Sequence, residues 1–339
     1  MLILAGDIGG TSTRLAFFET RDGGLTVAAE AHYPSREYGS LTEIVGLFVE
    51  QHRMSPLRAC FGIAGPVRAG TVRTPNLPWS IDAADLARLL GLPEVVLIND
   101  LDANAYGVGL LGAEELAVLN EGQPDPRGAI AVVSAGTGLG EAFAYWDGAC
   151  HRPLPSEAGH ADFAPRSGLE TELLLYLQAD YGRVSYERVI SGPGLYNIYR
   201  FLRDARHLPE TPGVAAAMRD SDPPAVITGA ALVGTCPLCG KALDLFMALY
   251  GAEAGNAALR FFATGGVYLG GGIAPRIIEK LKGSDFMGSF TAKGRLSAFL
   301  DAIPVKVIRN ERTALLGAGR CASMHGGVTS HGKRNEEAP

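Results

Sequence analysis

The chain contains a strand–glycine turn–strand pattern twice, and this repeat constrains the fold more than any other feature. In the first copy, an apolar strand at 2–5 leads through Gly9-Gly10 to a second strand at 13–18. The second copy spans 129–146, again with a glycine turn in its middle. Short apolar runs that stop at glycines are typical of buried strands. The repeat therefore predicts two related α/β halves.

Segments with a helical spacing of apolar residues separate and follow these strands. They lie at 41–53, 81–90, 173–181, 195–202, 241–263 and 312–324, and Asp82 is expected to cap the helix at 81–90. Further strands are predicted at 58–63, 95–98 and 305–308. Such alternation of strands and helices favours a layered α/β architecture. With 339 residues, the chain has room for two domains of about 100–200 residues each.

Composition excludes several classes of function. The net charge is −6 and no lysine- or arginine-rich run is present, which argues against nucleic-acid binding. No apolar run reaches the roughly 18–20 residues that cross a bilayer, so no membrane span is expected. The apolar start is too short for a signal peptide. The five cysteines form no regular framework, which agrees with a reducing compartment. We therefore expect a cytoplasmic protein.

The first glycine turn has the residues of a phosphate-binding loop. Gly9 and Gly10 let backbone N–H groups approach a phosphate without an intervening Cβ. Thr11 and Thr13 offer hydroxyl donors, and Asp7 at the strand end is suited to hold Mg²⁺ through water. A glycine hairpin with a structural aspartate is the alternative interpretation.

Two further glycine clusters strengthen the phosphate interpretation. The second turn contains Gly136, Thr137 and Gly138, and it has neither the glycine spacing of a dinucleotide fingerprint nor the lysine of a Walker loop. In the third, Gly271 and Gly272 follow a strand and precede a helix predicted near Pro275. A helix N-terminus in this position is suited to a nucleotide's phosphates or adenosine. Three such loops together predict nucleotide binding.

Several segments, taken in order, resemble the bacterial ATP-dependent glucokinases of the hexokinase and actin-like ATPase superfamily. They are 7–11, 98–100, 136–140, 156–160 and 187–194, followed by 272–276 as the adenosine segment. Each segment alone is weak, but their order and spacing are specific. The resemblance extends over most of the chain, from Asp7 to about Gly319.

This resemblance implies a fold and a reaction. The fold is α/β, with two ribonuclease-H-like (actin-like ATPase) domains around a central cleft. A small domain would contain 1–110 plus 301–325, a large domain 111–300, and 326–339 would form a flexible tail. The reaction would transfer the γ-phosphoryl group of ATP, with Mg²⁺, to the 6-hydroxyl of glucose. Its products would be glucose 6-phosphate and ADP, as in the first step of glycolysis, and a homodimer is expected.

The resemblance also assigns roles to individual residues. Asp100, at the carboxyl end of a β-branched strand, would take the proton from the sugar's 6-hydroxyl. Capping of the following helix is the alternative role for this aspartate. Asn99 both donates and accepts hydrogen bonds and is suited to a sugar hydroxyl. Glu157, His160 and Glu187 would hydrogen-bond glucose hydroxyls, with the carboxylates as strong acceptors.

Other uses of these residue types are weaker. Glu157 and His160 could belong to a metal site, but no third ligand has a convincing spacing, so no protein-bound metal is predicted. Cys236 and Cys239 are interpreted as small residues at the start of a helix rather than as zinc ligands. Glu141, directly after the second glycine loop, is unexpected in a strand and has no explanation from the sequence.

Two alternative functions remain open at this point. One is another hexose kinase of the same fold, acting on mannose, fructose or an N-acetylated amino sugar, or using polyphosphate or ADP as the donor. The other is a non-catalytic sugar sensor. A DNA-binding sensor would need an N-terminal helix-turn-helix, but the first phosphate loop already begins at Asp7. The acidic net charge also argues against it.

Overall fold

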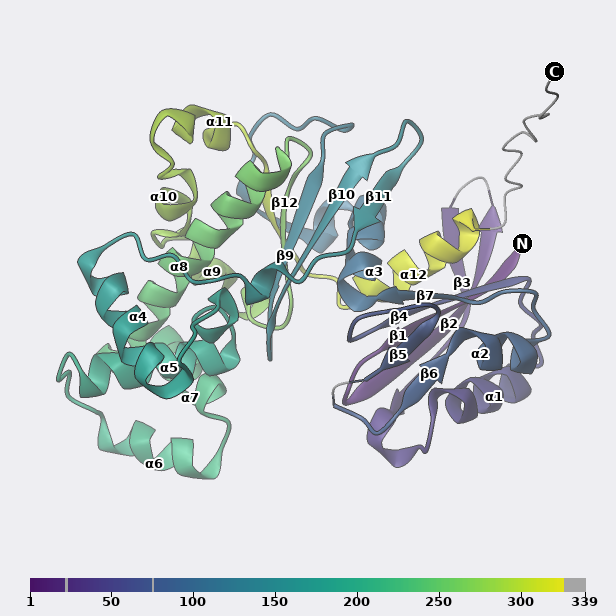
Figure 1. Cartoon of the computed structure of the whole chain (residues 1–339), viewed down its shortest axis with the longest axis horizontal. Coiled ribbons are helices and arrows are strands. Elements are labelled where there is room, and N and C mark those ends of the chain that lie inside the picture. Colours follow the sequence, from purple (N-terminus) through teal and green to yellow (C-terminus); the bar gives the residue numbers. More distant parts are fainter. Residues whose placement is uncertain (22–23, 75, 326–339) are drawn as a thin grey trace, which may run out of the picture. The chain divides into compact units, whose positions relative to one another are not determined.

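The computed structural model describes residues 1–21, 24–74 and 76–325, and it divides into two compact units (Figure 1). The first unit holds Met1–Gly107 and the described residues from Ala314 onward, and the second holds Val108–Thr313. The two are described separately below.

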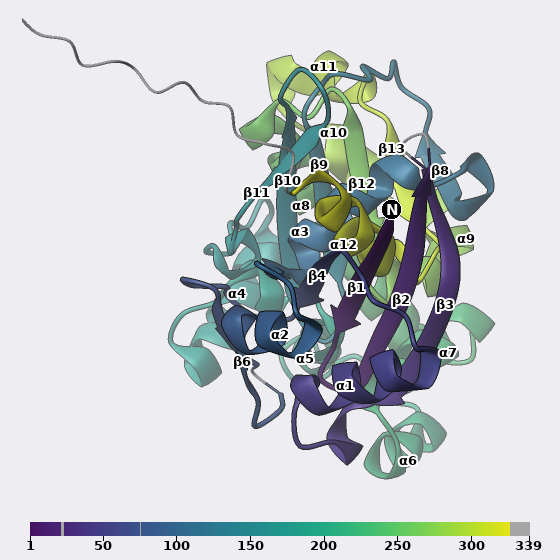
Figure 2. The same cartoon turned by 90° about the vertical axis from the view of Figure 1, so that its right-hand side faces the viewer.

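The sheet of the first unit has the strand order β3-β2-β1-β4-β7. Its strands are β1 (Leu2–Ile8), β2 (Ser12–Arg21), β3 (Gly24–Pro34), β4 (Arg58–Ile63) and β7 (Val96–Asn99). Figure 2 shows β1, β2 and β3 side by side; they pair antiparallel. β1, β4 and β7 run parallel, so their carboxyl ends share one edge of the sheet.

Both faces of this sheet are covered because apolar residues occupy both sides of the inner strands. Leu4 and Phe17 pack on one face in a cluster with residues of α1 (Leu41–His52) and α2 (Ala83–Leu90). Ile3 and Phe18 pack on the other face against α12 (Thr313–Met324). A side chain at Gly317 of α12 would overlap the Ala103 carbonyl of α3 (Asp100–Gly107), so glycine is required where these helices touch.

The sheet of the second unit has the strand order β11-β10-β9-β12-β13-β8. Its strands are β8 (Leu116–Asn120), β9 (Ile130–Ala135), β10 (Leu139–Trp146), β11 (His151–Leu154), β12 (Gly266–Gly270) and β13 (Val305–Ile308). β9, β12 and β13 are parallel, whereas β10, β11 and β8 pair antiparallel. The predicted strand–turn–strand hairpin is therefore β9–β10.

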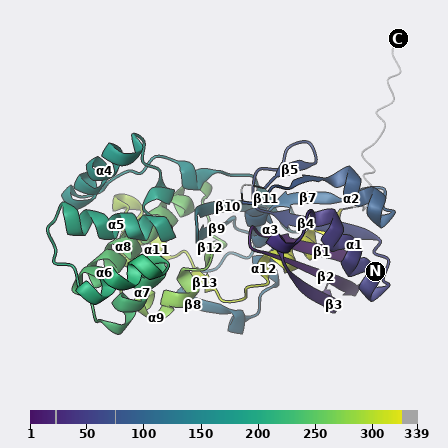
Figure 3. The ribbon, with the colours of Figure 1, turned by 90° about the horizontal axis from the view of Figure 1, so that it is seen from below.

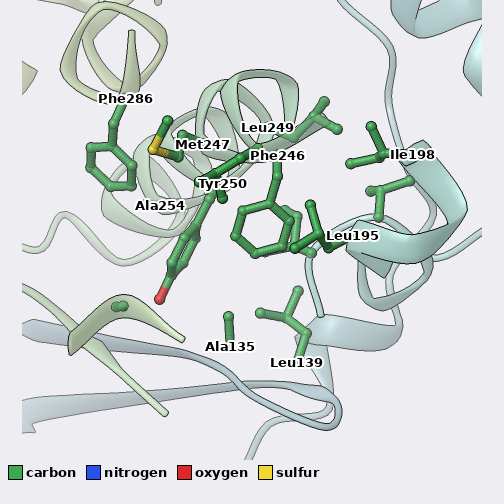
Figure 4. Packing of buried hydrophobic residues seen from close by; sticks show 14 of the residues in the cluster. Ala135, Leu139, Leu195, Ile198, Phe246, Met247, Leu249, Tyr250, Ala254 and Phe286 are labelled. Carbon is green, nitrogen blue, oxygen red and sulfur yellow. The ribbon is translucent and has the colours of Figure 1, made fainter. Parts of the chain in front are cut away.

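Helices gather beside this second sheet (Figure 3). They are α4 (Gly168–Tyr181), α5 (Gly192–Asp204), α6 (Pro212–Asp220), α7 (Pro223–Val233), α8 (Pro237–Phe261), α9 (Ile278–Lys282), α10 (Phe286–Thr291) and α11 (Ser297–Asp301). Figure 4 shows the core, where Phe246 and Tyr250 of α8 lie among Leu195 of α5 and Leu139 of β10. The Tyr250 hydroxyl donates to the carbonyl of Val133 at 2.8 Å, which satisfies a buried polar group.

The helices and strands predicted from periodicity are confirmed, with boundary shifts of a few residues at the longer elements. The predicted Asp82 cap is also present, because its carboxylate accepts from the Ala84 N–H at 2.7 Å. The helix expected at Pro275 is a 3₁₀ turn, η6 (Ala274–Ile277), that leads into α9. The prediction omitted several elements: β3, β8, β11, α6, α7, α10 and α11.

One domain boundary requires correction. The prediction placed 301–313 in the small domain, but β13 pairs with β12 and β8 in the second sheet. The chain therefore returns to the first unit only at Ala314, and leaves it at Gly107 rather than at 110. The predicted tail at 326–339 lies outside the described residues. Over the described ranges, no single helix is long and apolar enough to span a membrane; α7 and α8 pass that test only as a pair, bent by 102°.

Candidate active site

Acidic side chains gather where the parallel strands of the first unit end. Asp7 lies near the end of β1, and Asp100 and Asp102 lie in the first turn of α3, directly after β7. Burial, reinforced by the Asp100 carboxylate and opposed by Arg14, raises the pKa of Asp7 to about 6. Burial and Asp100 likewise raise the pKa of Asp102 to about 6. This edge of the sheet therefore concentrates negative charge.

The Asn99 amide fixes the turn that presents Asp100. Its Nδ2 donates to the Gly65 carbonyl at 3.1 Å, and its Oδ1 accepts from the Leu101 N–H at 2.8 Å. The same N–H lies 3.1 Å from Oδ1 of Asp100. Helix capping at this point is thus shared by Asn99 and Asp100. Each polar atom of an amide side chain has capacity for a further hydrogen bond, so capping leaves Asn99 able to meet a sugar hydroxyl.

The first glycine loop is closed by backbone hydrogen bonds. The Gly9 N–H donates to the Ser12 carbonyl at 2.9 Å, and the Ser35 N–H donates to the Thr11 carbonyl at 3.0 Å. The Thr11 side chain is exposed, and Gly10 is partly exposed beside it. These residues lie directly after Asp7, as the sequence predicted.

Thr13 differs from the prediction. Its side chain is fully buried, and its hydroxyl lies 3.0 Å from that of Ser35. The Ser35 hydroxyl donates to the Gly9 carbonyl at 2.9 Å, so the hydroxyl of Thr13 is left to donate to Ser35. Thr13 therefore supports the glycine loop from its buried side, through the Ser35 hydroxyl. The prediction that it offers a hydroxyl to a phosphate is corrected accordingly.

In the second unit, three predicted sugar-binding side chains lie on two 3₁₀ turns that contact each other. These turns are η4 (Ala158–His160) and η5 (Tyr186–Arg188). Glu157 precedes η4, and its carbonyl accepts from the His160 N–H at 3.0 Å. The His160 Nδ1 lies 3.8 Å from Oε1 of Glu187. Glu157 and His160 are exposed, so both side chains are accessible to a ligand.

Two glycines allow these turns to approach the second glycine loop. The other carboxylate oxygen of Glu187, Oε2, accepts from the Leu139 N–H at 3.1 Å. A Cβ at Gly138 would lie 2.5 Å from this oxygen. A Cβ at Gly159 would overlap the Leu139 carbonyl. The glycine loop and the predicted sugar ligands are therefore parts of one packed arrangement.

A cavity of about 700 Å³ lies in the second unit beside the glycine loops. The predicted residues Gly136, Thr137 and Gly272 line it. Its remaining walls come mainly from the start of α5, from α7 and from the 3₁₀ turn η6. Most of these side chains are small or apolar, whereas Arg276 adds a positive charge and Asp222 a negative one. Such a lining suits a flat apolar group with a few polar contacts.

Two predicted nucleotide contacts, Gly138 and Gly271, do not line this cavity. Gly138 lies against Glu187, as described above. Gly271 adopts a positive φ of 78°, and a side chain there would overlap the backbone of Ala135. Gly271 therefore shapes the turn between β12 and η6, where only glycine is unstrained.

One wall of the cavity was not predicted from the sequence. Pro223, Pro224, Thr228 and Gly229 of α7 all line it. The only signal for this was the Asp222-Pro-Pro start of a helix, which marks a helix N-terminus but not its ligand.

Metal ligands were not predicted, and within 1–21, 24–74 and 76–325 no cluster of three or more His, Cys, Asp or Glu side chains is arranged to hold a metal ion. Cys236 and Cys239 lie at the start of α8, as predicted. The Cys236 sulfur accepts from the Cys239 N–H at 3.4 Å and caps the helix.

Comparison with known proteins identifies a family for this chain. A model of the Glucokinase family matches residues 4–325. A glucokinase from Nostoc punctiforme is 42% identical over 337 residues, covering 95% of this chain and 99% of the relative. The chain belongs to the glucokinase family. Membership of this family makes the protein an enzyme that phosphorylates glucose, with ATP as the implied donor.

Solved structures confirm the predicted fold class. A glucokinase from an Antarctic psychrotroph, 31% identical, superposes with a TM-score of 0.85, covering 95% of this chain and 98% of the other. A ROK family glucokinase from Streptomyces griseus, 20% identical, superposes with a TM-score of 0.63, covering 95% and 99%. At that identity the second likeness shows the fold alone, which is mixed α/β with a sheet in each unit.

Proposed function

We propose that this glucokinase transfers the γ-phosphoryl group of ATP to the 6-hydroxyl of glucose, with Asp100 as the base that accepts the hydroxyl proton. The observation that carries this proposal is the acidic edge of the first sheet. There, Asp100 begins α3 at the carboxyl end of β7, beside Asp7 at the end of the parallel strand β1. Ligands of α/β proteins bind at such strand ends.

Glucose would be held by side chains that have unused hydrogen-bonding capacity. Glu157 and His160 are exposed, and Glu187 keeps lone pairs beyond the one that accepts from Leu139. Asn99 and Asp100 are proposed as further contacts to the sugar. Carboxylates accept strong hydrogen bonds from hydroxyls, so this set is suited to a polyhydroxyl ligand.

ATP would place its adenosine in the cavity lined by Gly136, Thr137 and Gly272. The phosphates would meet the loop at Gly9, Gly10 and Thr11, whose glycines leave backbone N–H groups accessible. The ROK family glucokinase from Streptomyces griseus was solved with glucose and AMPPNP, which supports the proposal that a protein of this fold takes a sugar and an ATP analogue.

Mg²⁺ fits the acidic edge. Asp7 and Asp102 offer only oxygen ligands, and burial together with the Asp100 carboxylate raises the pKa of both. A hard divalent cation near Asp7 would relieve this repulsion, with water between them. When bound, it would supply charge neutralisation on the phosphates. The chain itself would supply the position of Asp7 and the proton acceptor Asp100.

We also propose that the protein is a cytoplasmic homodimer, in keeping with its resemblance to the bacterial glucokinases and with its scattered cysteines. Sedimentation of the purified chain should give a species of twice the 35.6 kDa chain mass. A single species at the chain mass at micromolar concentration would contradict the dimer.

The test of the proposed function is a coupled assay for glucose 6-phosphate with Mg²⁺-ATP. Glucose would be compared with mannose, fructose and N-acetylglucosamine, and ATP with ADP and polyphosphate. We expect turnover with glucose and ATP that is lost in Asp100→Asn. Asp102→Asn, in the same turn of α3, is the matched control and should lose far less.

Each other outcome has a distinct meaning. Turnover only with another sugar or donor would keep the fold and the base but contradict the proposed substrate or donor. Equal activity of Asp100→Asn and the wild type would show that Asp100 is not the base. Sugar binding without any turnover would favour the sensor interpretation.

A further inference from the structure

Glu187, the predicted sugar ligand on η5, is held by the beginning of β10. Its Oε2 accepts from the Leu139 N–H at 3.1 Å. Leu139 is the first residue of β10, and Glu141 follows two residues later in the same strand. The position of Glu187 therefore depends on how β10 and η5 are held together.

Glu141 lies inside the protein, where a charge is costly. The residue is 1% exposed, and neither carboxylate oxygen has a hydrogen-bond partner among the described residues. The nearest cation is Arg260 of α8, whose Nη1 lies 3.8 Å from Oε2. The same Nη1 donates to Oε1 of Glu253 at 2.5 Å. Two buried carboxylates thus face one guanidinium.

The hydrogen bonds continue from Glu253 to η5. Oε2 of Glu253 accepts from Nδ2 of Asn256 at 2.8 Å, and the same Nδ2 donates to the Tyr186 hydroxyl at 3.0 Å. Lys293 donates to Oδ1 of Asn256 at 2.5 Å and fixes the orientation of the amide. Tyr186 is the first residue of η5 and directly precedes Glu187. We call Glu141, Glu253, Asn256, Arg260 and Tyr186 the buried acid cluster.

We propose that Glu141 is a positioning residue that acts through the buried acid cluster to hold Glu187 in place for glucose. The cluster connects β10, α8 and η5 behind the sugar-binding turns, and Glu187 bridges the same two segments, β10 and η5, on the ligand side. A change of charge at Glu141 would therefore disturb both the buried acid cluster and the hydrogen bond between Glu187 and the Leu139 N–H. This inference rests on the proposed role of Glu187 in glucose binding.

The charge state of Glu141 makes the cluster sensitive to pH. Burial and the Glu253 carboxylate raise the pKa of Glu141 to about 8, and Arg260 opposes them. At neutral pH Glu141 is therefore protonated, and its ionisation near pH 8 would place a second negative charge beside Glu253.

Other titratable groups also lie near Glu141 or on the elements that pack against its strand. Besides Glu253 and Arg260, α8 brings Tyr250, whose pKa lies above its ordinary value because of burial. Tyr186 faces the cluster from η5, and Lys293 reaches it through Asn256. Of the elements that pack on β10, β9 has no titratable side chain, η4 brings His160, and β11 brings His151 and Arg152 opposite Trp146 and Tyr145 at the far end of β10.

The test is the pH dependence of KM for glucose between pH 6 and 9.5, with kcat and KM for ATP measured in parallel. For the wild type, we expect KM for glucose to rise about three- to tenfold from pH 7 to 9, the range of a coupling through other residues. Glu141→Gln imitates the protonated acid and should remove this rise while leaving KM at pH 7 nearly unchanged. Coincident profiles of the variant and the wild type would overturn the proposal.

A second variant tests the connection to η5. Tyr186→Phe removes the hydroxyl that accepts from Asn256, and we expect KM for glucose to rise about three- to tenfold at every pH, with KM for ATP unchanged. Tyr199→Phe is the matched control, because it loses a hydroxyl that donates to Glu210 at 2.8 Å, away from the cluster. Equal effects of the two variants on KM for glucose would also overturn the proposal.

Calorimetric titration with glucose separates this inference from the proposed function. If the wild type binds no glucose at any pH, the proposed sugar site itself is wrong. If glucose binds and Glu141→Gln leaves the pH dependence of its affinity unaltered, only the role of Glu141 is wrong. Weaker binding above pH 8 in the wild type alone would support both.

Discussion

The two units hold different sets of the proposed functional residues, and the two sets differ in how their carboxylates are placed. In the first unit, Asp7, Asp100 and Asp102 crowd at the open ends of parallel strands, where a bound cation or a transferred proton can relieve their repulsion. In the second unit, Glu187 accepts a hydrogen bond from the Leu139 N–H, and the side chain of Glu141 is buried. The first arrangement is suited to reaction chemistry and the second to holding a ligand still.

This comparison predicts where substitutions should act. Changes in the acidic edge of the first unit should lower kcat, and changes in the turns of the second unit should raise KM. The largest effect is expected for Asp100→Asn, because loss of a general base typically costs about 10²–10⁴ in rate. Coupled assays give kcat, and glucose binding by calorimetry should remain close to that of the wild type.

The comparison would fail if Asp100→Asn abolished glucose binding while the few remaining complexes turned over at the normal rate. Thermal unfolding provides a control for folding. The variant removes one of three crowded carboxylates, so its Tm should equal or exceed that of the wild type.

The second prediction concerns Gly138→Ala in the second unit. The new Cβ would lie 2.5 Å from Oε2 of Glu187 and displace that carboxylate from the Leu139 N–H. Loss of a charged hydrogen bond of about 1.5–3 kcal/mol corresponds to a rise in KM for glucose of about 10- to 100-fold. Steady-state kinetics with varied glucose would measure it.

Gly136→Ala in the same loop is the matched control. A Cβ there would meet no atom closer than 3.8 Å, and Gly136 lines the cavity rather than the Glu187 contact. KM for glucose should therefore stay near the wild-type value. Similar KM values for glucose in the two variants would show that the hydrogen bond between Glu187 and the Leu139 N–H does not control sugar binding.

Much of this arrangement was predictable because local chemistry determines it. Glycines that interrupt apolar strands revealed both hairpins, and Asp82 marked the start of α2. Asp100 was found because it follows a β-branched strand, where ligands of α/β folds gather. These signals need only a few neighbouring residues.

The parts that the sequence did not reveal depend on contacts between distant segments. The cavity wall that α7 contributes was not predicted, because the sequence of a segment does not show which distant residues it will contact. Edge strand β3 alternates only weakly between buried and exposed residues, so its periodicity was not visible. The surroundings of Glu141 were not predictable, because the distant helix α8 places Glu253 and Arg260 beside it.

The third prediction concerns the pH dependence of activity and stability that Asp7 should cause. The raised pKa of Asp7, about 6, predicts that kcat/KM falls about tenfold per pH unit below pH 6, as the carboxylate that would bind the cation becomes protonated. The effect on stability has the opposite sign. Because the folded pKa exceeds the unfolded value, the favourable contribution of Asp7 is complete below about pH 4 and is lost as pH rises through 6.

Asp7→Asn provides the measurement. The Tm of the variant minus that of the wild type should grow as pH rises from 4 to 7, by an amount equivalent to at most about 3 kcal/mol, while the variant loses the acid limb of the activity profile. A Tm difference that stays constant over this range would mean that burial and the Asp100 carboxylate do not raise the pKa of Asp7 in solution.

The smallest effect separates two threonines of the first glycine loop. Thr13→Val should lose the buried hydrogen bond to Ser35 and lower stability by about 1 kcal/mol, or about 2–4 °C in Tm, with KM for ATP nearly unchanged. Thr11→Val should do the reverse, because its side chain is exposed and its carbonyl, not its hydroxyl, meets Ser35. Thermal unfolding and ATP kinetics on both variants test this assignment. If Thr13→Val raised KM for ATP as much as Thr11→Val, the buried hydroxyl would have to reach the nucleotide, and the loop in the first unit would need to open during binding.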